Sequence, residues 1–277
     1  MRLYETSVAV WLRVSKTEIG LISAGIAFFG FLAIFPALAA VITIWGFAAD
    51  PSMVQTQLNL AENYLPPEAF DLLYGQVQRI LATNTRSLGL ATLVSTLFAL
   101  WSARAGVGAL VSGINAIYGL PSRSGVRHVV RAFVMTLVLI GLVLSGMTLA
   151  VIMPLIIGLL PLGASAVNAL SAANFLVGML FVMMSIAMAY RLGPNRPREA
   201  IRPPLFTHGL FLALALWVGV SRGLVFYLGN FANYNQVYGS IGAVVALLMW
   251  FYLSAYAVLL GAAVDAEAQA HHHDKNQ

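Results

Sequence analysis

The sequence contains no cysteine and few charged residues. Without cysteine, the chain has no disulfide framework, no thiolate nucleophile and no cysteine-ligated zinc or iron–sulfur cluster. Charged residues make up only 9% of the 277 residues, against roughly a quarter in soluble domains, whereas 60% are hydrophobic. Most of the chain therefore cannot face water, and lipid is the solvent that fits this composition.

Motifs of several enzyme classes are also absent. There is no G-x-x-x-x-G-K-[ST] phosphate-binding loop, no H-E-x-x-H zinc motif and no recognisable serine-histidine-acid arrangement. The net charge of +5 is spread between apolar runs instead of being gathered in a nucleic-acid-binding stripe. We therefore expect a protein that is not an enzyme, binds no nucleic acid and uses no cofactor or metal.

Long apolar runs predict an all-α, polytopic membrane bundle. The uncharged run from Leu21 to Phe47 has 27 residues, roughly 40 Å of helix, enough to cross a hydrocarbon core of about 30 Å. The same reasoning along the chain predicts a single transmembrane domain, 1–277, with about six spans. These spans are 21–47, 87–104, 132–158, 166–190, 205–228 and 239–264.

Two further segments have apolar side chains at helical spacing and are expected to lie on the membrane surface. Phe70 to Leu81 is predicted as an outer interfacial helix, and Val107 to Tyr118 as an inner one. A seventh crossing through Ala105 to Ser122 is the alternative for the second segment, but it would place the following basic loops outside. The positive-inside rule therefore favours the interfacial assignment.

The positive charges predict that both chain ends lie in the cytoplasm. With six spans and an inside N-terminus, twelve of the 15 Lys and Arg residues fall in cytoplasmic segments. Two, Arg79 and Arg86, fall outside, and Arg222 lies within a span. Cytoplasmic loops of membrane proteins carry an excess of Lys and Arg, so this orientation satisfies the rule.

Four polar residues are candidates for a substrate pathway: Arg104, Asn115, Arg222 and Asp265. Arg222 is costly within a span, so it either faces a wet cavity or reaches the outer interface as an anchor. Arg104 is either an anchor at the inner end of the second span, which we favour, or the mouth of an anion-attracting cavity. Asp265 or its neighbour Glu267 is expected either to pair with Arg104 or Arg191, or to be solvated.

Two prolines and a histidine run complete the candidate features. Pro36 and Pro154 lie in expected spans, where proline frees a carbonyl and permits a kink. The run His271-His272-His273 is more readily explained as a flexible polar tail, or an artificial remnant, than as a metal site, because adjacent side chains in such a tail are not preorganised.

Four segments resemble the YihY/BrkB family of bacterial inner-membrane proteins. They are Tyr238 to Ala255 with Gly261-Ala262, Ala27 to Pro36, Trp101 to Gly106 with Asn115 and Tyr118, and Tyr190 to Pro194. The resemblance covers nearly the whole chain and implies a multi-pass protein of the bacterial inner membrane. One departure stands out: the family has an acid and then an Asn after Gly-Ala, whereas this chain has Ala263 and Asp265. A role of that acid would have moved to Asp265 or be absent.

The resemblance implies a fold and a location more than an activity. The family once carried the label of a tRNA-processing ribonuclease, ribonuclease BN, and some members are linked to serum resistance or envelope lipid handling. We expect a transporter or flippase-like protein for a lipid or another amphiphilic envelope component, with membrane lipids as partners and homo-oligomerisation left open. The alternatives are a nonenzymatic membrane scaffold for envelope integrity and, less favoured, a membrane-bound ribonuclease.

Overall fold

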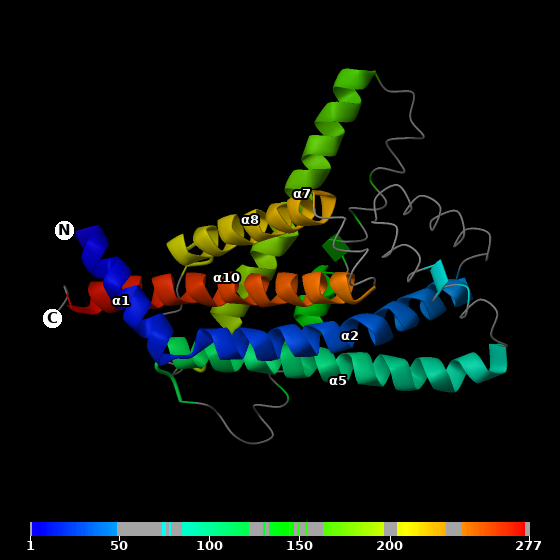
Figure 1. The fold of residues 1–277 in the computed structure, drawn as a ribbon, viewed down its shortest axis with the longest axis horizontal. Coiled ribbons are helices and arrows are strands. Elements are labelled where there is room, and N and C mark those ends of the chain that lie inside the picture. Colours follow the sequence, from blue (N-terminus) through cyan, green and yellow to red (C-terminus); the bar gives the residue numbers. More distant parts are fainter. Residues whose placement is uncertain are drawn as a thin grey trace. The chain divides into compact units, whose positions relative to one another are not determined.

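The computed structural model describes residues 2–48, 74–75, 78, 85–121, 130, 133–143, 145–146, 149, 153, 163–196, 204–230 and 240–274. Every principal element in these ranges is a helix (Figure 1). The helices are α1 (Arg2–Lys16), α2 (Ile19–Ala48), α5 (Thr85–Ile117), α7 (Ala164–Leu192), α8 (His208–Asn230) and α10 (Ser240–Asp274). The predicted all-α fold is confirmed.

Four helices are long and apolar enough to cross a membrane. Their spanning segments are Leu93–Ile117 in α5, Ser165–Leu192 in α7, His208–Tyr227 in α8 and Val244–Ala270 in α10. A fifth results if α1 and α2, which meet at a 61° bend, form one broken span. A shorter apolar helix, Phe133–Val143, falls within the expected third span. The count of six spans and the cytoplasmic placement of both ends stay predictions.

The second span differs from its prediction. We expected a span ending near Arg104 and a separate interfacial segment from Val107 to Tyr118, but α5 continues without a break to Ile117. Val111, Ile114 and Ile117 are buried, and Ile114 is fully so. The stripe predicted to face the membrane surface is therefore packed against protein, and Arg104 lies well inside the helix.

Several other predictions fall partly or wholly outside the described residues. Most of the Phe70 to Leu81 segment lies outside the described residues, as does Pro154. Helix α2 continues through Pro36, whose side chain is outside them, so the kink prediction remains open. The C-terminal tail was expected to be flexible, but α10 extends through His271 to His273 and ends at Asp274.

The chain divides into two compact units. Unit 1 consists of residues 1–23, 107–220 and 253–277, and unit 2 of residues 24–106 and 221–252. The helices α2, α5, α8 and α10 each contribute residues to both units.

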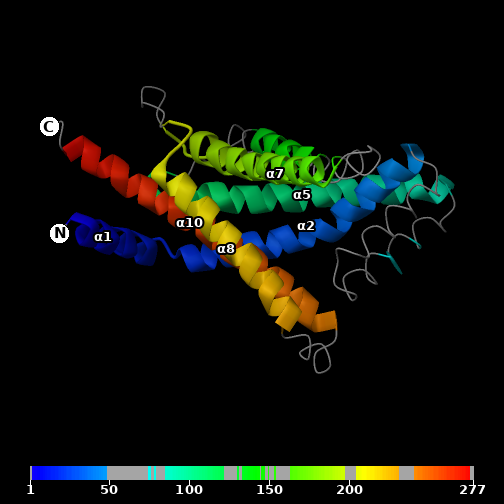
Figure 2. The ribbon, with the colours of Figure 1, turned by 90° about the horizontal axis from the view of Figure 1, so that it is seen from above.

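Unit 1 is packed around a close contact between α8 and α10. A Cβ atom added to Gly209 would lie 2.0 Å from the Gly261 carbonyl oxygen, and one added to Gly261 would lie 2.3 Å from the Gly209 oxygen. Glycine at both positions lets the two backbones touch, as small residues do at membrane helix interfaces. Leu210, Ala213 and Ala262 next to this contact are fully buried. In Figures 1 and 2, α1 lies beside the C-terminal end of α10 within this unit.

Unit 2 is held by small residues opposite aromatic rings. A Cβ atom added to Gly30 of α2 would lie 3.3 Å from the Phe251 ring of α10, and one added to Gly106 of α5 would lie 3.5 Å from Cβ of Phe29. The Trp250 indole N–H of α10 donates to the Ser221 hydroxyl of α8 at 3.1 Å. Glycine and serine therefore bring α2, α5, α8 and α10 close together in this unit.

Candidate functional site

The start of α8 is fixed by contacts between residues that are close together in the sequence. Thr207 is the N-cap residue, and its hydroxyl accepts the backbone N–H of Leu210 at 3.2 Å. The Phe206 and Phe211 rings stack with centroids 6.5 Å apart, which is the hydrophobic staple between the residue before the cap and the fourth helical residue. These two contacts explain why the helix begins at His208 after the proline-containing loop.

Asp265 brings α10 onto this terminus. Its Oδ1 accepts the backbone N–H of Gly209 at 2.7 Å, and its Oδ2 accepts a hydrogen bond from the Thr207 hydroxyl. Asp265 is only 3% exposed. A carboxylate at a helix N-terminus satisfies backbone donors that lack an intrahelical partner and opposes the positive end of the helix dipole. Asp265 therefore fixes α10 against the first turn of α8.

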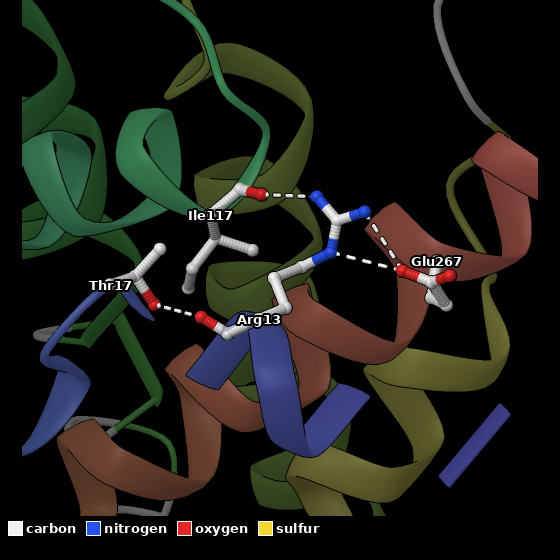
Figure 3. A network of polar contacts seen from close by, with 4 residues as sticks. All are labelled: Arg13, Thr17, Ile117 and Glu267. Carbon is white, nitrogen blue, oxygen red and sulfur yellow. Dashed lines mark hydrogen bonds and ion pairs between the residues drawn. The ribbon is translucent and has the colours of Figure 1, made fainter. Parts of the chain in front are cut away.

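Arg13 connects three helices of unit 1 (Figure 3). Its Nε and Nη2 donate to Oε2 of Glu267 on α10 at 3.1 and 2.8 Å, and its Nη1 donates to the Ile117 carbonyl at the end of α5 at 2.8 Å. The sequence left two alternatives for Asp265 and Glu267, a pair with Arg104 or Arg191 or solvated side chains. The observed ion pair joins Glu267 to Arg13 instead, and Asp265 caps α8.

Replacing Arg13 by alanine is expected to destabilise unit 1 by about 1 to 3 kcal/mol, because the Ile117 carbonyl and the Glu267 carboxylate lose a charged donor. Arg13→Lys keeps the charge but cannot make all three bonds, so it should recover only part of this loss. A double-mutant cycle with Glu267→Gln, read by thermal unfolding in detergent, measures the coupling. Fully additive single effects would show that the pair contributes nothing.

Asn115, a predicted pathway residue, makes a structural contact. It is 3% exposed, and its Oδ1 accepts the backbone N–H of Asn195 at 2.7 Å. The Asn195 side-chain amide donates to the Pro121 carbonyl at 3.3 Å. These bonds join the end of α5 to the segment after α7, so the Asn115 side-chain oxygen is used in a contact within the protein.

Tyr118, the first residue after the α5 span, lies under a guanidinium group. The Cζ atom of Arg196 is 4.8 Å from the centre of the Tyr118 ring. Burial raises the pKa of Tyr118 to about 12; the charge of Asp265 acts in the same direction, and Arg196 and a hydrogen bond with Gln269 oppose it. The phenol therefore stays neutral at physiological pH and acts as an aromatic platform for Arg196.

We call the residues Arg13, Asn115, Tyr118, Asn195, Arg196, Thr207, Asp265 and Glu267 the polar cluster; all lie in unit 1. Asn115 and Asp265 are the two predicted site residues that it contains. Sequence reasoning missed Thr207 and Asn195 and treated Arg13 and Arg196 only as topology signals. The threonine after two prolines and before an apolar run was a usable N-cap signal. Within the described ranges, no three His, Cys, Asp or Glu side chains form a metal-binding group.

Arg104 and Arg222 belong to unit 2. The Arg104 side chain is partly buried, and its Nε atom is buried with no hydrogen-bond partner among the residues that the structure describes. Arg222 is exposed on α8, five residues before the end of the His208–Tyr227 span. Arg104 is therefore a pathway candidate with a buried donor that no described acceptor satisfies. For Arg222, both predicted roles stay open, a residue facing a wet cavity and an anchor at the outer interface.

Comparison with known proteins shows to which family the chain belongs. The family model described as Virulence factor BrkB matches residues 10–277. The chain belongs to the BrkB family. The resemblance predicted from Tyr238 to Ala255 and the other three segments is thereby confirmed. The prediction of a membrane protein with several apolar helices is confirmed as well.

Relatives within the BrkB family differ in how much of the chain they match. The ribonuclease-like protein YfkH of Bacillus subtilis (strain 168) is 30% identical over 253 residues, 88% of each chain. A UPF0761 membrane protein of Aeromonas salmonicida (strain A449) is 26% identical over 93% of this chain and 86% of the relative. One from Xanthomonas campestris pv. campestris (strain B100) is 38% identical over 95 residues, only 22% of that relative. No solved structure matches the chain.

Proposed function

We propose that this BrkB-family protein is a transporter or flippase-like protein of the bacterial inner membrane that moves an anionic lipid or another anionic amphiphile of the envelope. The proposal rests on one observation: the buried Arg104 Nε atom, inside the Leu93–Ile117 span, has no acceptor among the described residues. In this proposal the partners of the protein are membrane lipids, and the protein moves its substrate without catalysing a reaction on it.

The position of Arg104 supports a ligand contact more than an anchor. It lies 11 residues after the start and 13 before the end of the Leu93–Ile117 span. At about 1.5 Å per residue, this is close to the middle of the segment. An arginine at the centre of a spanning helix costs about 2.5 to 3.5 kcal/mol on insertion scales. Anchors at span ends avoid this cost, so a central arginine is better explained by a ligand that offsets it.

The buried Nε atom indicates what kind of ligand fits. A buried charged donor without an acceptor is unfavourable by about 1 to 3 kcal/mol or more. Phosphate and carboxylate groups accept N–H bonds from guanidinium and neutralise its charge. An amphiphile with such a headgroup would satisfy Arg104 while its acyl chains remain among the apolar side chains of the spans.

Purified protein reconstituted into liposomes is expected to accelerate the movement of a labelled anionic lipid between leaflets several-fold over protein-free vesicles. A zwitterionic lipid with the same acyl chains should move more slowly, because it lacks the net charge that Arg104 attracts. Dithionite bleaching of the outer-leaflet label gives the rate. No acceleration for any anionic or zwitterionic lipid would contradict transport of lipids and favour the scaffold alternative.

The ribonuclease alternative rests on the former label of the family and on the name of YfkH, and that name applies to the Bacillus protein. We propose that the present chain leaves RNA intact when the purified protein is incubated with a divalent metal ion. Metal-dependent cleavage that persists through two purification steps would favour the nuclease instead.

A further inference from the structure

Helix α1 has an apolar face that no described part of its own unit covers. Val8, Trp11 and Leu12 are 40%, 67% and 52% exposed, and their spacing of three and four residues places them on one side of the helix. Ser15 continues this side, and the exposed Lys16 flanks it. The opposite side holds Val14, which is 7% exposed. The helix thus has one face toward the protein and a second, largely apolar, face away from it.

The orientation of α1 is fixed by polar contacts. Arg13 binds Glu267 and the Ile117 carbonyl, so α1 cannot rotate to bury Trp11 without breaking three hydrogen bonds (Figure 3). The exposure of the apolar face is therefore a built feature of unit 1. A large exposed tryptophan held outward by an ion pair calls for a partner outside the chain.

The chain bends between α1 and α2, so α1 does not continue along the axis of α2. The two helices meet at 61°. Glu18 at the corner has a φ of 49°, in the left-handed region, and its carbonyl accepts the N–H groups of Leu21 and Ile22 at 2.9 and 3.2 Å. The Thr17 hydroxyl donates to the Arg13 carbonyl at 2.9 Å and closes α1. The bend is therefore set by specific hydrogen bonds.

Length also keeps α1 out of the hydrocarbon core. Helix α2 alone has 30 residues, about 45 Å, which exceeds a core of about 30 Å. Only Thr17 and Glu18 separate the end of α1 from the start of α2, so α1 must lie near the membrane surface when α2 crosses. Tryptophan is enriched at this depth, and lysine there reaches lipid phosphates.

We propose that α1 is an interfacial helix that docks on the lipid bilayer, with Val8, Trp11 and Leu12 inserted at the boundary between headgroups and acyl chains. The partner is the membrane surface itself. The Arg13–Glu267 pair holds the helix in this orientation while α2 crosses the membrane. This inference does not depend on the transport proposal, since docking and lipid movement are measured separately.

Site-directed spin labelling of this cysteine-free chain tests the proposal in liposomes. A label on Leu12→Cys should lie roughly 5 to 10 Å below the headgroup level, with high oxygen accessibility and several-fold lower access to a polar nickel reagent than a label on Lys16→Cys. Equal nickel access at both positions would overturn the proposal. Dipolar broadening between labels at position 12 would also overturn it, because a second copy of the chain would then cover the face.

Tryptophan fluorescence provides a second measurement on a nearly unchanged protein. The difference between the native protein and Trp11→Phe isolates the Trp11 signal from the other four tryptophans. Lipids brominated near the headgroup should quench this signal more strongly than a water-soluble quencher does. The reverse order would place Trp11 in water and contradict docking.

Discussion

Alanine at Gly209 or Gly261 is expected to prevent α8 and α10 from packing in unit 1, the largest effect of any single methyl group that we predict. The new Cβ atom at Gly209 would meet the Gly261 oxygen at 2.0 Å and the Asp265 Cγ at 2.6 Å. At Gly261 it would meet the Gly209 oxygen at 2.3 Å and Ala213 Cβ at 2.8 Å. Backbone atoms and short side chains cannot rotate away, so the helices must separate.

Separation removes more than the glycine contact, because the Asp265 hydrogen bonds to α8 depend on the same approach. We therefore expect a loss above the usual cost of overpacking, more than about 3 kcal/mol. Gly219→Ala on α8 is the matched control, since no atom of the described residues lies within 4 Å of its added Cβ. Gly113→Ala should be intermediate, because it meets only the methyl ends of Ile22 and Leu259, at 2.9 and 3.0 Å.

The fraction of protein that stays monodisperse after heating in detergent ranks these variants. The expected order of stability is Gly219→Ala, then Gly113→Ala, then Gly209→Ala and Gly261→Ala. Similar stability for Gly219→Ala and Gly261→Ala would show that the two helices do not approach each other as closely as the structure shows.

Replacing Asp265 by alanine should have the second-largest effect, about 2 to 4 kcal/mol of destabilisation. The change leaves the Gly209 N–H and the Thr207 hydroxyl without their acceptor in a buried site and removes a negative charge from the positive end of α8. Asp265→Asn retains an acceptor oxygen for Gly209 and should cost only about 1 kcal/mol. Thermal unfolding of both variants gives the comparison.

Equal destabilisation by Asp265→Ala and Asp265→Asn would contradict the capping role, since it would attribute the whole effect to charge. The same pair separates capping from a pathway role. If Asp265→Asn keeps its fold and its lipid movement in liposomes, the residue is structural. A folded Asp265→Asn variant that has lost lipid movement would support the pathway role predicted from the sequence.

Local patterns were sufficient for most of the helices. The uncharged runs predicted the apolar parts of α2, α7, α8 and α10, because a membrane-spanning helix must satisfy its backbone internally and bury apolar side chains in lipid. The end of α5 was not predictable in this way. Its glycines and polar residues, including Gly108, Ser112 and Asn115, resemble an interfacial segment until Ile22 and Leu259 from other helices are seen to cover Gly113.

Contacts between distant residues explain why the polar cluster was largely missed. Arg13 and Glu267 are separated by 254 positions, and Asp265 reaches Gly209 across 56. No local periodicity specifies such pairs, so the sequence identified Asp265 as a candidate but not its partners. The capping signals at Thr207 and the family segments at Tyr190 and Gly261 were local, yet only packing shows that they meet in one unit.

The role of Arg104 in transport is tested by comparing lipid movement by the native protein with that by Arg104→Gln and Arg104→Lys in the same liposomes. We expect at least a tenfold loss of lipid movement for Arg104→Gln, with unchanged thermal stability. Arg104→Lys should recover much of the movement, because lysine still offers a positive charge to an anionic headgroup. Arg222→Gln, measured alongside, decides whether that exposed residue is an anchor or part of the pathway. Undiminished movement of anionic lipid by a folded Arg104→Gln variant would contradict the role proposed for Arg104.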